Sequence, residues 1–164
     1  MHFNTRYICT TQNWFGGGMD VTPTIKDDNE KNKFHQTLKS MCNRHNKNYY
    51  KKYKKWCDEY FYLPHRNEAR GIGGIFFDYK KDNFERDFKF VRDVGVTFQM
   101  IFNNIIEKKI KKKWTLKDKE MQYIKRGRYA EFNLLYDRGT KFGLQTGGNV
   151  EGILMSLPPI AKWK

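Results

Sequence analysis

HFNTRYIC, residues 2–9, alternates between polar and apolar side chains along its length. Because successive side chains of a β-strand point to opposite faces, this period of two predicts a strand with one polar and one mostly apolar face. The polar face carries His2, Asn4 and Arg6, and the other face carries Phe3, Thr5 and Tyr7. The alternative interpretation of this pattern is an edge strand whose polar face meets solvent, which is common in antiparallel sheets.

Two glycine-rich segments follow along the chain. Residues 16–18 are Gly-Gly-Gly, and because three glycines offer no side chains to pack, we predict a loop or a bulge there. Residues 71–79 read GIGGIFFDY, which predicts a short strand that is buried on both faces and weakened by its glycines. Asp20, just after the first run, is open to two interpretations, a turn residue or a functional carboxylate.

Helices are predicted between and after these segments. Asp27 or Asp28 can cap a helix that runs to about Arg44, a long helix starts near Asn83, and a shorter one starts near Thr115. The expected apolar stripes are Phe34, Leu38, Met41 and Cys42 in the first helix, Tyr49, Tyr53, Trp56 and Tyr60 in the next, and Phe84, Phe88, Val91, Phe98, Phe102 and Ile105 in the long one.

The last third of the chain predicts a meander of strands. The expected strands are residues 128–136, 141–145 and 150–157, joined by turns at residues 137–140 and 147–149. Strands joined by tight turns must be antiparallel, so the predicted class is α+β, with helices on both faces of an antiparallel β-sheet. We find no internal repeat and expect one domain over residues 1–164.

The chain is strongly basic, with a formal net charge of +14 from 32 basic and 18 acidic residues among 164. A positive charge attracts nucleic acid, membrane surfaces or small polycarboxylates, and it does not choose among them. The lysine runs 51–52 and 54–55 lie opposite the apolar stripe of their helix, which favours solvation. No stretch of about 18 apolar residues predicts a transmembrane segment, and three cysteines without a signal pattern predict reduced thiols.

Several segments together resemble the oxygen-dependent coproporphyrinogen III oxidase family, in the family's order and over nearly the whole chain. One glycine run would be weak evidence, whereas the ordered set is specific. The segments are HFNTRY at 2–7, WFGGGMDVTP at 14–23, FHQTLK at 34–39, YKKWCDEYF at 53–61, HRNEARGIGGIFFD at 65–78, residues 126–143, and ILMSLP at 153–158.

The resemblance implies a coproporphyrinogen III oxidase-like fold and an enzyme of haem biosynthesis. Such an enzyme converts two propionates of coproporphyrinogen III to vinyls with molecular oxygen and without haem, flavin or nicotinamide, and we expect no cofactor. It also implies a homodimer, with about 129–163 in the dimer region. Relative to the family, the chain looks as though it lacks an N-terminal portion and a C-terminal end. The expected location is the cytoplasm, with mitochondria or plastids as alternatives if a missing N-terminus carried a transit peptide.

The resemblance also assigns roles to residues. His2 corresponds to the family's proton donor and Asn4 and Arg6 to its substrate-binding Asn-x-Arg, which suits carboxylate recognition by arginine. Asp20 and Asp137 become candidate anchors for pyrrole N–H groups, with turn chemistry as the alternative for each. Arg138 becomes a candidate structural or carboxylate partner.

Two features of the family pattern are less certain in this chain. The family's Gly-Gly-Arg reads Gly147-Gly148-Asn149 here, so the guanidinium is lost and another cation, such as Lys141, would have to bind that carboxylate. His2, His35 and His65 correspond to metal ligands assigned in some bacterial members. We favour a hydrogen-bonded structural role for His35, since no pair of these histidines has the i, i+4 spacing of a helical metal site.

Two alternatives to an active oxidase remain open from the sequence. The charge of +14 is compatible with a basic nucleic-acid-binding module, although no helix-turn-helix, zinc-finger or RNP signature supports it. The chain is also compatible with an inactive core fragment of the oxidase.

Overall fold

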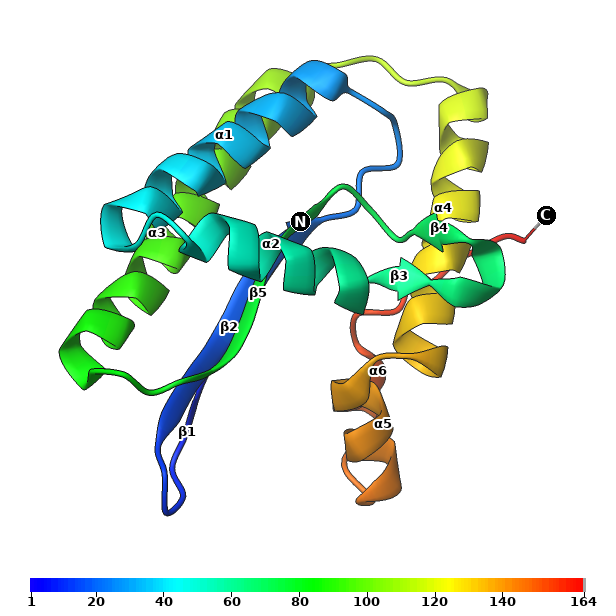
Figure 1. Cartoon of the computed structure of the whole chain (residues 1–164). Helices are drawn as coiled ribbons and strands as arrows, with labels where there is room; N and C mark the ends of the chain where they lie inside the picture. The colour runs from blue at the N-terminus through cyan, green and yellow to red at the C-terminus, as the bar shows by residue number, and fades with distance from the viewer. Residues whose placement is uncertain (164) are drawn as a thin grey trace.

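The computed structural model describes residues 1–163 and places a small antiparallel sheet between two groups of helices (Figure 1). The elements are β1 (His2–Ile8), β2 (Trp14–Val21), α1 (Asp28–His45), α2 (Tyr49–Tyr60), β3 (Tyr62–Leu63), the 3₁₀ turn η1 (Pro64–Arg66), β4 (Glu68–Ala69), β5 (Gly73–Lys80), α3 (Phe84–Lys109), α4 (Leu116–Leu135), α5 (Arg138–Gln145) and α6 (Val150–Leu154). The α+β class predicted from the sequence is confirmed.

The sheet has the strand order β1-β2-β5, and β3 pairs with β4 in a separate short hairpin. Both neighbours of β2 are antiparallel to it, with His2 opposite Asp20 on one side and Asp20 opposite Gly74 on the other. The predicted strands at 2–9 and 71–79 are therefore confirmed within one or two residues. The prediction of a loop at residues 16–18 is wrong, because these glycines form the middle of the central strand.

The two faces of the sheet have different chemistry. One face packs against α1 and α3 through Met19, Ile75 and Phe77, which are buried in the main core. The Phe3 ring stacks on Phe98 of α3, with 5.5 Å between centroids. On the other face, Phe76 joins a second core that includes Cys57, Phe61, Leu63 and Phe132.

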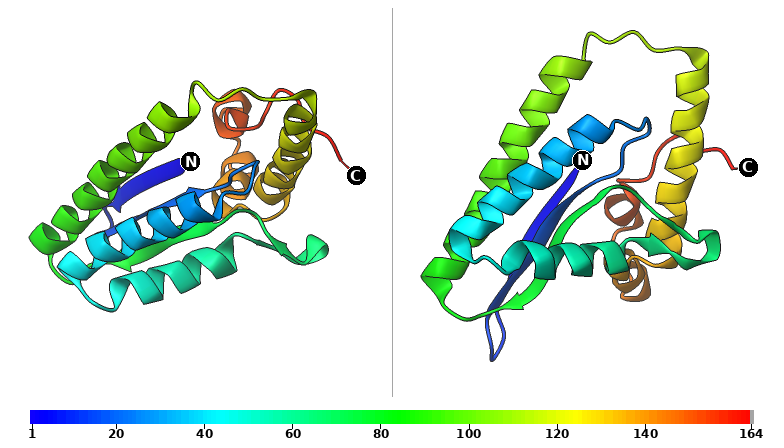
Figure 2. Two further views of the ribbon diagram at one scale, coloured as in Figure 1. Left: turned by 90° about the horizontal axis from the view of Figure 1, so that it is seen from above. Right: turned by 45° about the horizontal axis from the view of Figure 1, so that its top comes forward.

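The helices divide between these two sides of the sheet. Both views in Figure 2 show α1 and α3 to the left and α4, α5 and α6 to the right, with the segment between α3 and α4 joining the two groups. The strands therefore lie between α1 and α3 on one side and α4, α5 and α6 on the other. Within residues 1–163, no helix is both long enough and apolar enough to cross a membrane.

Several helix predictions hold in detail. Asp27 caps α1 by accepting a hydrogen bond from the Glu30 amide, and Thr115 caps α4 in a capping box with Asp118. The stripe predicted for α1 is fully buried. The seam predicted for α3 is only partly correct, because Phe84, Phe88 and Phe102 are exposed, and the buried residues of α3 are Asp87, Phe90, Val91, Val94, Thr97 and Ile101.

The meander of strands predicted after residue 128 is wrong. Residues 128–135 continue α4, whose buried residues include Gly127, Ala130 and Asn133 at the three-residue spacing of a helix face. Leu134, inside the expected strand, is half exposed to solvent. The helix that starts after the Thr115 capping box continues through these residues.

The two predicted turns are helix starts instead. Asp137 caps α5 by accepting a hydrogen bond from the Thr140 amide, and Asn149 caps α6 by accepting from the Glu151 amide. The expected strands at 141–145 and 150–157 are therefore replaced by α5 and α6. Asp and Asn favour tight turns and helix N-caps for the same reason, since their short side chains accept hydrogen bonds from nearby amides.

Gly16 is the position in the central strand where an added side chain would meet the ion pair between Arg6 and Asp78. A Cβ atom at this residue would overlap Oδ1 of Asp78 and would lie 2.8 Å from Nε of Arg6. We expect Gly16→Ala to push the two ion-paired side chains apart and to lower the free energy of unfolding by about 1–3 kcal/mol. Urea unfolding followed by circular dichroism measures the change.

The matched control is Gly152→Ala in α6, where the nearest heavy atom to the added Cβ is 4.0 Å away. Because alanine favours helix, this variant should be neutral or more stable by up to about 1 kcal/mol. Equal stability losses in the two variants would contradict the steric argument for Gly16.

Candidate active site

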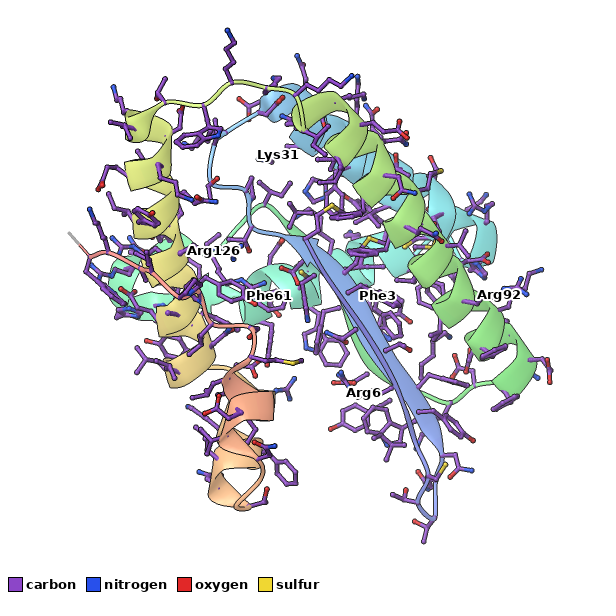
Figure 3. The ribbon with its side chains drawn as sticks, turned by 180° about the vertical axis from the view of Figure 1, so that it is seen from behind. Phe3, Arg6, Lys31, Phe61, Arg92 and Arg126 are labelled. Carbon is purple, nitrogen blue, oxygen red and sulfur yellow. The ribbon has the colours of Figure 1, made fainter. Side chains whose placement is uncertain are left out.

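The polar face of β1 looks toward the α4–α6 side of the sheet. Figure 3 shows Phe3 and Arg6 on opposite sides of the β1 ribbon, with Phe3 toward α3. Register places His2 beside Asp20 of β2 and Arg6 beside Gly16. The structure thus brings His2, Arg6 and Asp20, three of the residues predicted to be functional, onto one face.

His2 and Asp20 form the first half of this face. Nδ1 of His2 lies 3.1 Å from Oδ1 of Asp20, and the other carboxylate oxygen of Asp20 is ion-paired with Arg70. The His2 side chain is 46% exposed, whereas those of Asp20 and Arg70 are 5% and 4% exposed. A buried ion pair therefore supports a histidine that reaches solvent.

The charge state of Asp20 decides which nitrogen of His2 carries a proton. Burial opposes ionisation of Asp20, but the hydrogen bond from His2 and the charge of Arg70 outweigh it and hold the pKa of the carboxyl below its usual value. An ionised carboxylate can only accept, so Nδ1 of His2 must donate to it. Nε2 is then the ring nitrogen left to meet a ligand, as a proton donor when the ring is charged.

Arg6, Asn4 and Asp78 form the second half of the face. The guanidinium of Arg6 donates to Oδ1 of Asp78 through Nε, at 3.0 Å, and through Nη2. Its Nη1 donates to Oδ1 of Asn4 at 3.3 Å. Asn4 and Arg6, predicted as a pair, are therefore in contact, and a buried carboxylate orients the arginine.

Arg138 approaches the same carboxylate from α5. One of its terminal nitrogens lies 4.0 Å from Oδ2 of Asp78, and its guanidinium lies over the Tyr60 ring at 5.0 Å. The Tyr60 ring stacks on Phe76 with 4.8 Å between centroids, and Arg6 lies 5.5 Å from the Phe76 ring. Asp78 thus has one arginine near each oxygen, and a pair of stacked rings separates the two guanidinium groups.

Asp137 is tied to the same region through Tyr60. The Tyr60 hydroxyl donates to Oδ1 of Asp137 at 3.0 Å, and Oδ2 of Asp137 accepts from the Thr140 amide at 2.7 Å. Each oxygen keeps a further lone pair for a ligand donor. Asp137 therefore combines the turn-type role, here a helix cap, with a position next to Arg138.

Among residues 1–163, the hydrogen bonds of the Gly147-Gly148-Asn149 segment stay within α5 and α6 and do not reach the sheet. The Gly148 amide donates to the Gly143 carbonyl at 2.9 Å, and Asn149 caps α6. Gly147 has a positive φ of 69°, which explains a glycine at this link between helices. Lys141, the proposed replacement cation, is exposed on α5.

The three histidines considered as metal ligands have separate partners. Nε2 of His35 lies 2.9 Å from the Ile72 carbonyl and Nδ1 lies 3.1 Å from the Tyr50 hydroxyl, so both ring nitrogens have hydrogen-bond partners. His65 contacts Glu131 and Tyr136, both at 2.8 Å. In the described part of the chain, no group of three or more His, Cys, Asp or Glu side chains has a metal-binding arrangement.

The contact of His65 belongs to a network that joins the β3–β4 hairpin to α4. Glu131 accepts hydrogen bonds from His65 and from Arg66, whose Nη2 lies 2.6 Å from Oε1. The bond from Arg66 lowers the pKa of Glu131, burial opposes the shift, and the bond from His65 adds to it, giving a pKa of about 2. This carboxylate stays charged well into acid.

Arg70, Asp78 and Tyr60 were not singled out as functional residues by sequence reasoning. Asp78 could have been found, because a period of two places it on the same face as Gly74 and Phe76. Arg70 lies in an irregular segment after β4, where periodicity carries no information. Only the fold shows that it reaches Asp20.

The architecture and this face define a class: an α+β domain that presents paired cations and an oriented histidine, suited to an anionic ligand. The sequence profile described as coproporphyrinogen III oxidase matches residues 1–164. Curated relatives named oxygen-dependent coproporphyrinogen-III oxidase from Rickettsia bellii (strain OSU 85-389), Rickettsia akari (strain Hartford) and Rickettsia rickettsii (strain Sheila Smith) are each 58% identical over 164 residues, covering 99% of this chain.

The chain therefore belongs to the coproporphyrinogen III oxidase family, as the resemblance indicated. It spans 59% of the length of these relatives. The polar face described above lies within the matched region.

The low pKa of Glu131 predicts a pH-dependent contribution to stability. A carboxyl whose pKa is lowered by folding stabilises the fold above its ordinary value of 4.5, and the contribution is lost as pH falls toward about 2. Glu131→Gln should lower the free energy of unfolding by about 1–3 kcal/mol at pH 7. The difference in stability between the variant and the parent protein should shrink steadily as the pH falls below about 4.5. Urea unfolding at pH 3 to 7 measures it.

Glu59→Gln is the control, because Glu59 is exposed and its nearest cation, Lys55, is 3.8 Å away. Its effect should stay within about 0.5 kcal/mol at every pH. A loss in Glu131→Gln that does not change with pH would argue against an ionic origin.

Proposed function

We propose that this protein is an oxygen-dependent coproporphyrinogen III oxidase that converts two propionates of coproporphyrinogen III to vinyls and gives protoporphyrinogen IX. One observation carries the proposal. A chain 58% identical to enzymes of that name places the predicted His2, Asn4 and Arg6 on one sheet face, with His2 and Arg6 oriented by buried carboxylates.

Arg6 and Arg138 are the proposed carboxylate-binding groups. Both guanidinium groups lie near Asp78, which offsets one of their two positive charges and leaves a net positive site. An arginine can bind a carboxylate through two parallel hydrogen bonds, and Asn4 adds an amide beside Arg6. This arrangement suits a substrate with several propionates.

His2 is the proposed proton donor, acting through Nε2. Each propionate that becomes a vinyl loses carbon dioxide, one proton and two electrons, and molecular oxygen accepts the electrons. The protein must then control protons close to the reacting side chain, and a histidine held by a carboxylate is suited to that task. Asp20 and Asp137 are the proposed anions near the pyrrole N–H groups, with Asp20 also orienting His2.

The remaining parts of the proposal follow from the family. Oxygen is the co-substrate, and we propose that no metal or organic cofactor takes part. Gly147, Gly148 and Asn149 are proposed to contact substrate, as the matching segment does in the family. We also propose a homodimer through about 129–163, where Phe142, Val150 and Met155 are exposed apolar side chains. The free thiols of Cys9, Cys42 and Cys57 support the cytoplasm as the compartment.

The direct test is turnover of coproporphyrinogen III by the full-length protein in air, followed by protoporphyrin fluorescence after oxidation. We expect product in air, none without oxygen, and no change after treatment with a chelator. Loss of activity on chelation, restored by one metal, would overturn the cofactor-free proposal. No product from the folded full-length protein would overturn the oxidase proposal.

Running residues 1–164 alone in parallel tests whether this part of the protein is sufficient. Activity of the full-length protein without activity of the shorter chain would identify residues 1–164 as an inactive core. Binding of nucleic acid with a fixed stoichiometry and a steep salt dependence would instead favour the basic-module alternative.

Substitutions on the polar face test the assigned roles. His2→Gln should lower kcat by about 100- to 10,000-fold, because the group that moves the proton is lost. Arg6→Lys should raise KM by about 10- to 100-fold, because lysine cannot make two parallel bonds to a carboxylate. Steady-state kinetics of the full-length variants separates the two effects.

Arg92→Lys is the matched control. Arg92 lies on α3, and Figure 3 shows it on the far side of the molecule from α4. Its kinetic constants should equal those of the parent protein. Normal turnover by His2→Gln would remove His2 from the mechanism.

A further inference from the structure

Arg70 is the most enclosed cation near the site. Its side chain is 4% exposed and its ion pair with Asp20 is also buried. Enclosing a guanidinium is unfavourable unless it is well paired, and replacing such a pair by apolar side chains is often neutral or stabilising. The fold therefore retains a pair that stability alone does not require.

Three aromatic rings surround the guanidinium. Its central carbon lies 3.9 Å from the Phe61 ring centroid, 4.9 Å from that of Phe132 and 5.2 Å from that of Tyr129. These rings come from the end of α2 and from α4, so the cage links both helices to the sheet (Figure 3 labels Phe61). Cation–π contact favours a flat guanidinium in such a cage.

The backbone brings Arg70 to this place. The Arg70 amide donates to the Phe61 carbonyl at 2.9 Å, and the Ile72 amide donates to the Val21 carbonyl at 2.9 Å. Between them, a Cβ at Gly71 would overlap the Val21 carbonyl oxygen, so glycine allows the chain to pass against the end of β2. This close passage places Arg70 next to Asp20, one residue before Val21.

Hydrogen bonding inside the cage is directed at Asp20. Nη2 of Arg70 pairs with Oδ2 of Asp20, while Nε has no hydrogen-bond partner among residues 1–163. The other oxygen of Asp20 faces Nδ1 of His2. Arg70, Asp20 and His2 therefore form a continuous chain of contacts from the aromatic cage to the exposed imidazole.

We propose that Arg70 is a positioning residue, which holds Oδ2 of Asp20 so that Oδ1 accepts the Nδ1–H of His2 and Nε2 faces the substrate. The inference rests on the proposed role of His2 as proton donor. Without Arg70, the Asp20 carboxylate has no fixed orientation, and the neutral His2 ring can place its proton on either nitrogen.

The decisive measurement is the tautomer of His2, read from the ¹⁵N chemical shifts of histidine-labelled full-length protein without substrate. His2→Gln assigns the signals, and Asp20→Asn is the reference for loss of the carboxylate. We expect the Nδ1–H form in the parent protein and a mixed or Nε2–H form in Arg70→Met. Arg70→Lys should also shift toward the mixed form, because a lysine ammonium lacks the planar fork.

Kinetics of the same variants gives the second readout. Misorientation of His2 should lower kcat by about 10- to 100-fold. KM should change less than kcat, because Asp20 keeps its charge and the proposed carboxylate-binding residues Arg6 and Arg138 are untouched. The control is Arg126→Met, which removes a guanidinium 5.3 Å from the same Tyr129 ring but outside the ion pairs of Asp20. It should leave both the tautomer and kcat unchanged.

An unchanged Nδ1–H signal in folded Arg70→Met or Arg70→Lys would overturn the proposal. If Arg70→Met does not fold, Arg70→Lys decides, since it keeps the charge in the cage. Because the tautomer is measured without turnover, a protein that gives no protoporphyrinogen would refute the oxidase function and still report on Arg70.

Discussion

The polar face depends on one constraint: the ion pair between Arg6 and Asp78 needs the space above Gly16 of β2. Arg6 of β1 and Asp78 of β5 are on the two strands that flank β2, so their ion pair must pass over the central strand. Any side chain at Gly16 would occupy that space. A central strand with glycine therefore gives up packing on this face so that charged groups from its two neighbours can meet.

The two faces of the sheet differ, because one packs against the apolar core and the other carries the charged side chains of the candidate site. The face toward α1 and α3 is filled by apolar side chains, while the opposite face carries the buried Asp20 and Asp78, whose side chain is 7% exposed. Each carboxylate is paired with an arginine, which offsets the unfavourable burial of its charge. The cations are thus held in place before any ligand arrives, which reduces the loss of side-chain freedom on binding.

Features set by neighbouring residues could be predicted from the sequence, whereas features set by contacts between distant segments could not. Period-two alternation at residues 2–9 and the caps at Asp27 and Thr115 are local signals, and the structure confirms them. The Gly16–Gly18 strand was missed because the need for glycine there is non-local. Side chains of Arg6 and Asp78 from the flanking strands lie against Gly16, and backbone atoms of those strands lie against Gly17 and Gly18. From residue 128, the expected strand belongs instead to a helix that starts 12 residues earlier at Leu116, after the capping box at Thr115.

The candidate site divides in the same way. His2, Asn4 and Arg6 share one strand, so periodicity and the family resemblance both pointed to them. Arg70 is 50 residues from Asp20 in sequence, and their contact exists only because the chain passes the end of β2 at Gly71. Residues that contact a ligand can therefore be inferred from a local motif, whereas the residues that orient them depend on tertiary packing. In this protein, the second group includes Arg70, whose buried guanidinium links the end of α2 and α4 to the face carrying His2.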